Sequence, residues 1–168
     1  LGDVYKRQGG EAATLEPLHE HLFEYKTHMM QNYGAGVQAC YRGPRLYDTP
    51  ETQAAVTEVI QWYKKYRDIL NSDMIHLRRP DARDWDGFIH VNPHKKEKGL
   101  AMFFNPTHQE ITRTIHIPLY YTGLTQTARI REKEQKPVTY KLNRDYTVEL
   151  TVKIPANGYT WYVVEAAD

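Results

Sequence analysis

The hydrophobic period of the chain changes once, close to residue 72, and this change is the strongest constraint on its fold. Before it, apolar residues recur every three or four positions, as on one face of an α-helix. After it, apolar and polar residues alternate, most clearly in residues 147–154, whose sequence is TVELTVKI. Alternation of this kind is typical of a half-buried β-strand. The sequence therefore predicts a helical part followed by a β-rich part.

The helical part contains two predicted helices with one short predicted strand between them. The first helix spans residues 15–33 and is followed by Gly34, a residue that commonly ends a helix. Residues 37–41 are mainly apolar and stop at a loop, as a buried strand would. The second helix has Thr49 as its N-cap and Pro50 at its first position, the residue types preferred there.

The β-rich part holds seven predicted strands, which indicates an antiparallel β-sandwich. They are residues 88–91, 100–104, 115–119, 127–131, 138–142, 147–154 and 159–165. Turn-rich segments such as NPHKKEKG and NPTHQE separate them. The single predicted strand of the helical part, residues 37–41, has no predicted sheet partner beside it in the sequence. Backbone N–H and C=O groups that are buried without hydrogen bonds are costly. This strand therefore either joins the β-rich part or belongs to a larger α/β structure.

Composition argues against several classes of partner. Lys plus Arg number 22 and Asp plus Glu number 21, so the formal net charge is +1 and a nucleic-acid partner is not expected. No apolar stretch approaches the roughly 20 residues of a membrane helix, so no membrane partner is expected either. The histidines are scattered and there is a single cysteine, which predicts no metal site. No phosphate-binding glycine motif is present, and we expect no cofactor.

The first eight residues, LGDVYKRQ, are interpreted apart from the rest. Residues 3–8 back-translate to a sequence that resembles the transposon adapter used for shotgun, including metagenomic, sequencing libraries. We interpret residues 1–8 as an adapter scar and exclude them from fold reasoning. A genuine polar turn is the alternative. If the scar is real, the reading frame is truncated on its N-terminal side.

Five segments of the chain carry a resemblance to a known family. They are YKKYRDILNSDMIHLRRPDARDWDG, HVNP, KGLAMFFNP, IHIPLYYTGL and IPANGYTWYVVE. Together they resemble the end of a bacterial glycoside hydrolase of the α-galactosidase type, which has a (β/α)8 barrel followed by a C-terminal antiparallel β-sandwich. The resemblance implies an α+β fragment. Residues 9–72 would be the end of the catalytic barrel (helix 7, strand 8 and helix 8), and residues 73–168 would be the sandwich.

The same resemblance implies a function. Such enzymes hydrolyse O-glycosyl bonds of α-galactoside-like substrates by double displacement, using two carboxylates near the ends of middle barrel strands. The motifs of those carboxylates have no counterpart in this sequence, so no catalytic residue is assigned and the chain alone is expected to be inactive. Its carbohydrate substrate would bind through the missing barrel. A secreted or periplasmic location suits such enzymes, but the sequence leaves it open, like the oligomeric state. The rival hypothesis is a stand-alone carbohydrate-binding or structural β-sandwich module.

The loop after the predicted strand holds the first candidate substrate-binding residues. Residues that follow a barrel strand face the active-site mouth, so Tyr41, Arg42, Arg45 and Tyr47 could contact a sugar. Arginine forks suit hydroxyls or a carboxylate, and tyrosine rings suit a sugar face. The alternative is that the arginines pair with Asp48 or with helix carbonyls and that the tyrosines simply pack.

Aromatic residues of the β-rich part are the second group of candidates. Trp85 lies among three carboxylates, Asp81, Asp84 and Asp86, and a sugar ring could stack on it. The alternative is a polar turn with a half-buried tryptophan. An aromatic platform is also conceivable, although alternating aromatics in strands usually pack as cross-strand pairs. Its members would be Tyr120, Tyr121, Tyr159, Trp161 and Tyr162.

Overall fold

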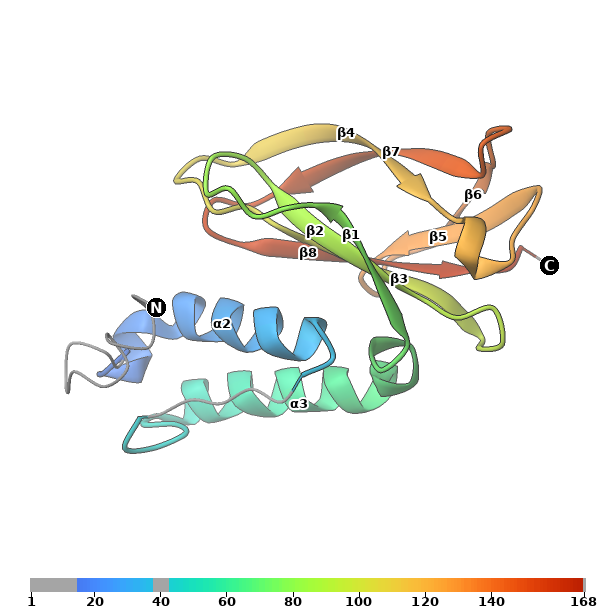
Figure 1. Ribbon diagram of the computed structural model, residues 1–168. Coiled ribbons are helices and arrows are strands. Elements are labelled where there is room, and N and C mark those ends of the chain that lie inside the picture. The colour runs from blue at the N-terminus through green and yellow to red at the C-terminus, as the bar shows by residue number, and fades with distance from the viewer. Residues whose placement is uncertain (1–14, 38–42, 168) are drawn as a thin grey trace. The chain divides into compact units, whose positions relative to one another are not determined.

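A computed structural model of the chain describes residues 15–37 and 43–167 and shows an α+β fold with two compact units (Figure 1). Unit 1 holds the described residues up to Tyr66 and is helical. Unit 2 begins at Arg67 and consists mainly of antiparallel strands. The division falls inside a helix. The domain boundary that the sequence predicts, between residues 72 and 73, stays a prediction.

Unit 1 is built on two helices, as the hydrophobic period predicts. The first begins as a 3-10 turn, η2 (Leu18–His21), and continues as α2 (Leu22–Gly34), so it starts three residues later than predicted and ends at the predicted glycine. The second is α3 (Pro50–Leu70), whose last turn extends into unit 2.

Side-chain caps define the start of α3. The hydroxyl of Thr49 accepts a hydrogen bond from the backbone N–H of Thr52 at 3.3 Å. In return, the hydroxyl of Thr52 accepts bonds from the N–H groups of Asp48 and Thr49, each at 3.0 Å. These bonds satisfy donors that a helix start leaves without partners, and the predicted N-cap is confirmed.

The two helices run parallel, side by side (Figure 1). Contacts between them follow the same order along both: His19 with Asp48 at 2.8 Å, Lys26 with Glu58 at 2.8 Å, and Tyr33 with Tyr63 at 5.1 Å between ring centroids. The end of α2 therefore lies far from the start of α3, by roughly the 20 Å length of a 13-residue helix. Gly34 and Pro50 therefore lie at opposite ends of the helix pair.

Unit 2 contains two antiparallel sheets. The larger sheet has the order β1 (Asp73–Arg78), β2 (Asp86–Val91), β3 (Glu97–Phe104), β8 (Tyr159–Glu165), β5 (Thr127–Glu132) and β6 (Val138–Lys141). The smaller sheet pairs β4 (Ile111–Pro118) with β7 (Thr147–Ile154). A 3-10 turn, η3 (Tyr120–Thr122), lies between β4 and β5.

All seven predicted strands of the β-rich part are present, and the structure adds β1, which the sequence analysis missed. The sequence of β1, DMIHLR, has charged residues at both ends and no clean alternation. Its residues are exposed or half-buried, because β1 is an edge strand of the larger sheet. The hydrophobic pattern of an edge strand is weak, since neither face needs to be fully apolar.

The core of unit 2 lies between the two sheets. Alternate residues of β7 fill it, as the TVELTVKI pattern predicts, and they pair across the small sheet with β4: Ile115 faces Leu150, and Ile117 faces Val148. The larger sheet contributes Ile89, Val91, Ala101, Phe103, Ala128, Ile130, Tyr162 and Val164 to the same core.

The opposite face of the larger sheet is also apolar at its centre. Leu100 pairs with Val163, and Met102 pairs with Trp161. None of these four side chains belongs to the core between the sheets. A sheet with only one covered face alternates between apolar and polar residues, whereas these central strands do not. The larger sheet therefore has the composition of a sheet that is covered on both faces.

Gly87 provides a test of the sheet register. A Cβ at this position would lie 2.5 Å from the carbonyl oxygen of Met102 in β3. Since that atom is backbone, the two strands would have to separate, and we expect Gly87→Ala to destabilise the chain by about 1–3 kcal/mol. Denaturant unfolding followed by tryptophan fluorescence measures this loss. Thr114→Ala, at an exposed position of β4, is the control and should change stability by less than about 0.5 kcal/mol. Equal midpoints for the two variants would contradict the register.

Candidate functional site

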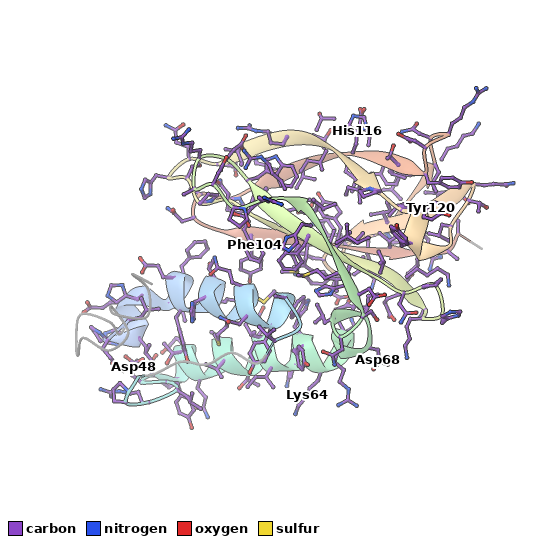
Figure 2. The ribbon with its side chains drawn as sticks, in the orientation of Figure 1. Asp48, Lys64, Asp68, Phe104, His116 and Tyr120 are labelled. Atoms are coloured by element: carbon purple, nitrogen blue, oxygen red, sulfur yellow. The ribbon has the colours of Figure 1, made fainter. Side chains whose placement is uncertain are left out.

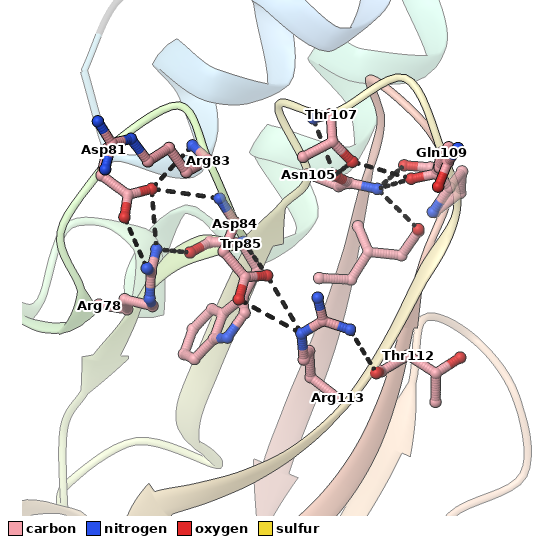
Figure 3. A network of polar contacts seen from close by, with 12 residues as sticks. Arg78, Asp81, Arg83, Asp84, Trp85, Asn105, Thr107, Gln109, Thr112 and Arg113 are labelled. Carbon is pink, nitrogen blue, oxygen red and sulfur yellow. Dashed lines mark hydrogen bonds and ion pairs between the residues drawn. The ribbon is translucent and has the colours of Figure 1, made fainter.

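The predicted acidic corner around Trp85 is the turn between β1 and β2 (Figure 3). The guanidinium of Arg78 donates to both carboxylate oxygens of Asp81, at 3.2 and 2.7 Å, and to the carbonyl of Trp85 at 2.6 Å. The same carboxylate accepts the backbone N–H groups of Arg83 and Asp84. One aspartate thus holds the whole turn together.

A second aspartate ties this corner to the smaller sheet. The side chain of Arg113, in β4, donates to Asp84 at 3.2 Å, and Asp84 also accepts the N–H of Trp85 at 2.8 Å. The indole ring of Trp85 packs half-buried against the core, 5.8 Å from the ring of Phe103. The corner matches the interpretation as a polar turn with a half-buried tryptophan. A contact between Trp85 and a sugar stays a prediction.

The three carboxyl groups of the corner have different proton affinities. The bonds from Arg78 and the backbone hold the pKa of Asp81 well below its usual range. Desolvation would raise the pKa of Asp84, but the N–H of Trp85 and the Arg113 guanidinium lower it overall. Desolvation raises the pKa of Asp86. Glycoside hydrolysis needs one ionised and one protonated carboxyl group. Here the two ionised carboxylates, Asp81 and Asp84, bind the guanidinium groups of Arg78 and Arg113. This arrangement indicates a structural role.

The loop of residues 43–49 carries the other candidates. Arg45 forms an ion pair with Glu16 at 3.4 Å, and 56% of its side chain remains exposed. Tyr47 is 46% exposed. The loop is attached to α2 through Tyr25, whose hydroxyl donates to the carbonyl of Leu46 at 2.9 Å. Both candidates therefore lie at the N-terminal ends of the two parallel helices.

The remaining candidates of that loop, Tyr41 and Arg42, lie outside the described residues, as does most of the predicted strand of residues 37–41. The sequence analysis allowed the alternative that an arginine pairs with Asp48. Arg45 instead pairs with Glu16, and Asp48 is bound by His19 and Thr52.

A histidine–aspartate pair fixes the start of α3. His19 Nδ1 lies 2.8 Å from Asp48, in the loop before α3 (Asp48 is labelled in Figure 2), and the backbone N–H of His19 donates to the same carboxylate at 3.1 Å. The side-chain bond to Asp48 raises the pKa of His19. Desolvation works against ionisation of Asp48, but the bonds from His19 and Thr52 lower its pKa to about 2.

The members of the suggested aromatic platform separate into two groups. Trp161 and Tyr162 are buried and Tyr159 is half-buried. Only Tyr120 and Tyr121 are exposed, at 62% and 63%. A groove lies beside Tyr121, and its other lining residues are Asp73, Met74, Ile75, His76, Val91 and Pro93. The sequence analysis missed this groove because four of its seven lining residues belong to β1, the strand without a clear hydrophobic pattern.

Among residues 15–37 and 43–167, no three His, Cys, Asp or Glu side chains gather as metal ligands would. No described helix combines the length and the apolar character that crossing a bilayer requires.

No protein-family model and no curated protein sequence matches the chain. Solved structures do match it. One is α-galactosidase I from Mortierella vinacea, with 14% identity and a TM-score of 0.56, over 84% of this chain and 35% of that one. Another is a GH27 β-L-arabinopyranosidase from Geobacillus stearothermophilus, with 11% identity and a TM-score of 0.58, over 86% and 30%.

The α-amylase from Geobacillus thermoleovorans also matches, with 15% identity and a TM-score of 0.60, over 88% of this chain and 34% of that one. The chain thus spans about a third of the length of these structures. At sequence identities this low, the similarity shows a shared fold and nothing more. The chain resembles, in fold, a part of GH27 α-galactosidases and related glycoside hydrolases.

The pair of His19 and Asp48 predicts how the stability of the helices depends on pH. The contribution of Asp48 is complete above its ordinary pKa of 3.8 and is lost as the pH falls through about 2. The contribution of His19 is complete below its ordinary pKa of 6.5 and is lost as the pH rises through its raised value. Stability should therefore be greatest between these two ordinary values.

Thermal unfolding followed by circular dichroism at 222 nm, at pH values from well below 3.8 to well above 6.5, measures the effect. We expect Asp48→Asn to flatten both the acidic and the alkaline decline. The control is Asp68→Asn, at an exposed position of α3, which should leave both in place. An unchanged profile in Asp48→Asn would show that the pair does not stabilise the helices.

Proposed function

We propose that this chain is the C-terminal part of a glycoside hydrolase with a (β/α)8 catalytic barrel, acting on α-galactoside-like substrates. The observation that carries the proposal is the parallel packing of α2 and α3, followed directly by an antiparallel sandwich. The fold likeness to parts of two enzymes of glycoside chemistry, an α-galactosidase and an arabinopyranosidase, supports it.

Parallel neighbouring helices favour a βα-type connection. Helices joined by a short loop pack antiparallel, whereas parallel neighbours need a returning segment between them. In a (β/α)8 barrel that segment is a strand, and it runs opposite to both helices. The sequence predicts a strand at residues 37–41, between the two helices along the chain. This order of helix, strand and helix is the one expected at the end of a barrel.

The position of the candidate residues agrees with a substrate-binding role. In a barrel, the N-terminal end of each helix lies on the same side as the C-terminal ends of the strands, where active sites are found. Arg45 and Tyr47 lie at this end of the helix pair and keep about half of their side-chain surface exposed. We propose that they line the substrate entrance, together with Tyr41 and Arg42.

The rival hypothesis of a stand-alone sugar-binding module fits the sandwich less well. Trp161 is buried, and Trp85 is half-buried with its ring against Phe103, so the two tryptophans do not form an open aromatic platform. The larger sheet is apolar on both faces at its centre, which is unusual for a sandwich that stands alone in water. The sandwich is better explained as a domain attached to a larger body.

The chemistry would come from the part of the enzyme that precedes these residues. Retaining glycosidases place two carboxyl groups about 5–5.5 Å apart, one as nucleophile and one as acid and base. In the acidic corner of unit 2, Asp81 and Asp84 bind arginines that stabilise the turn, and we assign no catalytic role to them. The present chain should therefore not turn over a glycoside.

Recovery of the upstream reading frame from the source DNA tests the proposal. We expect the frame to continue past Gly9 into alternating strands and helices, and the longer protein to hydrolyse p-nitrophenyl α-galactopyranoside. In that protein Arg45→Ala should raise KM by about tenfold or more if Arg45 contacts substrate. Glu149→Gln, at an exposed position of β7, is the control and should leave the kinetics unchanged.

Two results would overturn the proposal. One is a start codon close to Gly9. The other is glycoside turnover by the present chain that a point change within it abolishes.

A further inference from the structure

Tyr120 and Tyr121 are the most exposed aromatic residues among those described in unit 2, at 62% and 63%. Figure 2 labels Tyr120, in the turn between β4 and β5. Its ring contacts those of Tyr121 and Tyr146 edge to face, at 5.1 and 5.4 Å between centroids. Within the described residues, neither Tyr120 nor Tyr121 uses its hydroxyl in a hydrogen bond. The packing of the sandwich therefore does not explain why these two aromatic rings are exposed to solvent.

The turn that carries these rings is fixed by its neighbours. The buried hydroxyl of Thr122 donates to the carbonyl of Leu119 at 2.5 Å. Gly123 ends the turn with a φ of 77°, and a Cβ there would lie 3.1 Å from Pro93. The turn therefore lies close against the loop between β2 and β3. A binding surface that is ordered in advance loses little entropy when a ligand arrives.

A groove of about 680 Å³ lies beside Tyr121, within the range of about 300–1,000 Å³ typical of small-molecule sites. We call it the Tyr121 groove. Its apolar lining includes Ile75 and Val91, which lie on the same face of the larger sheet, and Asp73 adds a carboxylate on that face of β1. Met74 and His76 alternate with these residues along β1 and project to its other face. The side chain of Asp73 makes no hydrogen bond or ion pair within the described part of the chain.

The chemistry of the groove selects its ligand. An aromatic ring and apolar side chains suit the C–H face of a pyranose, while the free carboxylate of Asp73 can accept hydrogen bonds from its hydroxyls. None of the residues that line the groove is a lysine or an arginine, and the carboxylate repels anions. Phosphates, nucleic acids and acidic sugars are therefore disfavoured, and a neutral saccharide is favoured.

We propose that the Tyr121 groove is a non-catalytic binding site for a neutral saccharide, with the ring of Tyr121 stacked on a pyranose face. In a glycosidase such a site would hold a substrate chain away from the catalytic centre. The inference rests on unit 2 alone and does not require the proposed catalytic barrel.

Titration of the 15N-labelled chain with melibiose and with maltotriose, followed by amide chemical shifts, tests the site. Inorganic phosphate is the anionic comparison. We expect saturable shifts with at least one saccharide, centred on the amides of Met74, His76 and Val91, and none with phosphate. Tyr121→Ala should weaken binding by about tenfold or more, whereas Tyr121→Phe, which keeps the ring, should stay within about threefold of the original. Val138→Ala, on the edge strand β6, should not change the affinity.

Three outcomes would overturn the proposal. The first is no saturable shift with either saccharide at tens of millimolar. The second is a set of shifts centred away from the groove or unchanged in Tyr121→Ala, whose unfolding midpoint is measured in parallel. The third is a concentration-dependent dimer that Tyr121→Ala abolishes, because a second copy of the chain would then occupy the groove. Each result concerns saccharide binding, so it leaves the test of the longer reading frame independent.

Discussion

The parallel packing of α2 and α3 is the constraint on which the functional interpretation depends. It is fixed at its two ends by different forces: a hydrogen-bonded carboxylate, Asp48, at the N-terminal end, and a pair of tyrosine rings, Tyr33 and Tyr63, near the other. Two parallel helices are not a simple helical hairpin, in which the helices run antiparallel. A strand between them along the chain needs partners in a sheet, because its backbone groups would otherwise be left without hydrogen bonds.

Polar contacts at one end of unit 2 connect strands and turns of the sandwich, in addition to its apolar core. The amide of Asn105, nearly fully buried, donates to the carbonyls of Gln109, Ile154 and Pro155, and so joins the end of β3 to the end of β7 (Figure 3). At the same end, Asp84 and Arg113 connect the turn after β1 to β4. Buried polar groups that are satisfied in this way specify one arrangement of the two sheets. Sequence resemblance singled out the Asn-Pro turn at residues 105–106, and its asparagine proves to be one of these structural connections.

The sequence predicts most of the fold because the strongest signals are periodic. The helix cap at Thr49 and the alternation of residues 147–154 lead directly to the observed start of α3 and to β7. The edge strand β1 has no such signal, and with it the sequence analysis missed the Tyr121 groove. Which aromatic residues are exposed also depends on tertiary packing. In the sequence, Trp161 and Tyr120 are equally good candidates for contact with a sugar, yet Trp161 is buried and Tyr120 is exposed. The role of the arginine loop stays a prediction that rests on its position after a predicted strand, and the contact of Arg45 with Glu16 has no local sequence signature.

Two proposed features of glycoside chemistry are independent of each other: a saccharide site in the Tyr121 groove of the sandwich, and a helix pair that would complete a catalytic barrel. The second is the central claim, because it decides where the reaction takes place. It requires residues 37–41 to be a strand whose hydrogen-bond partners come from other residues of a larger sheet.

Amide hydrogen exchange of residues 37–41 tests this claim most directly, measured in the present chain and in the product of the longer reading frame. The account predicts slow exchange in the longer protein and fast exchange in the present chain, with the helices α2 and α3 protected in both. Slow exchange of these residues already in the present chain, or fast exchange in both proteins, would contradict it.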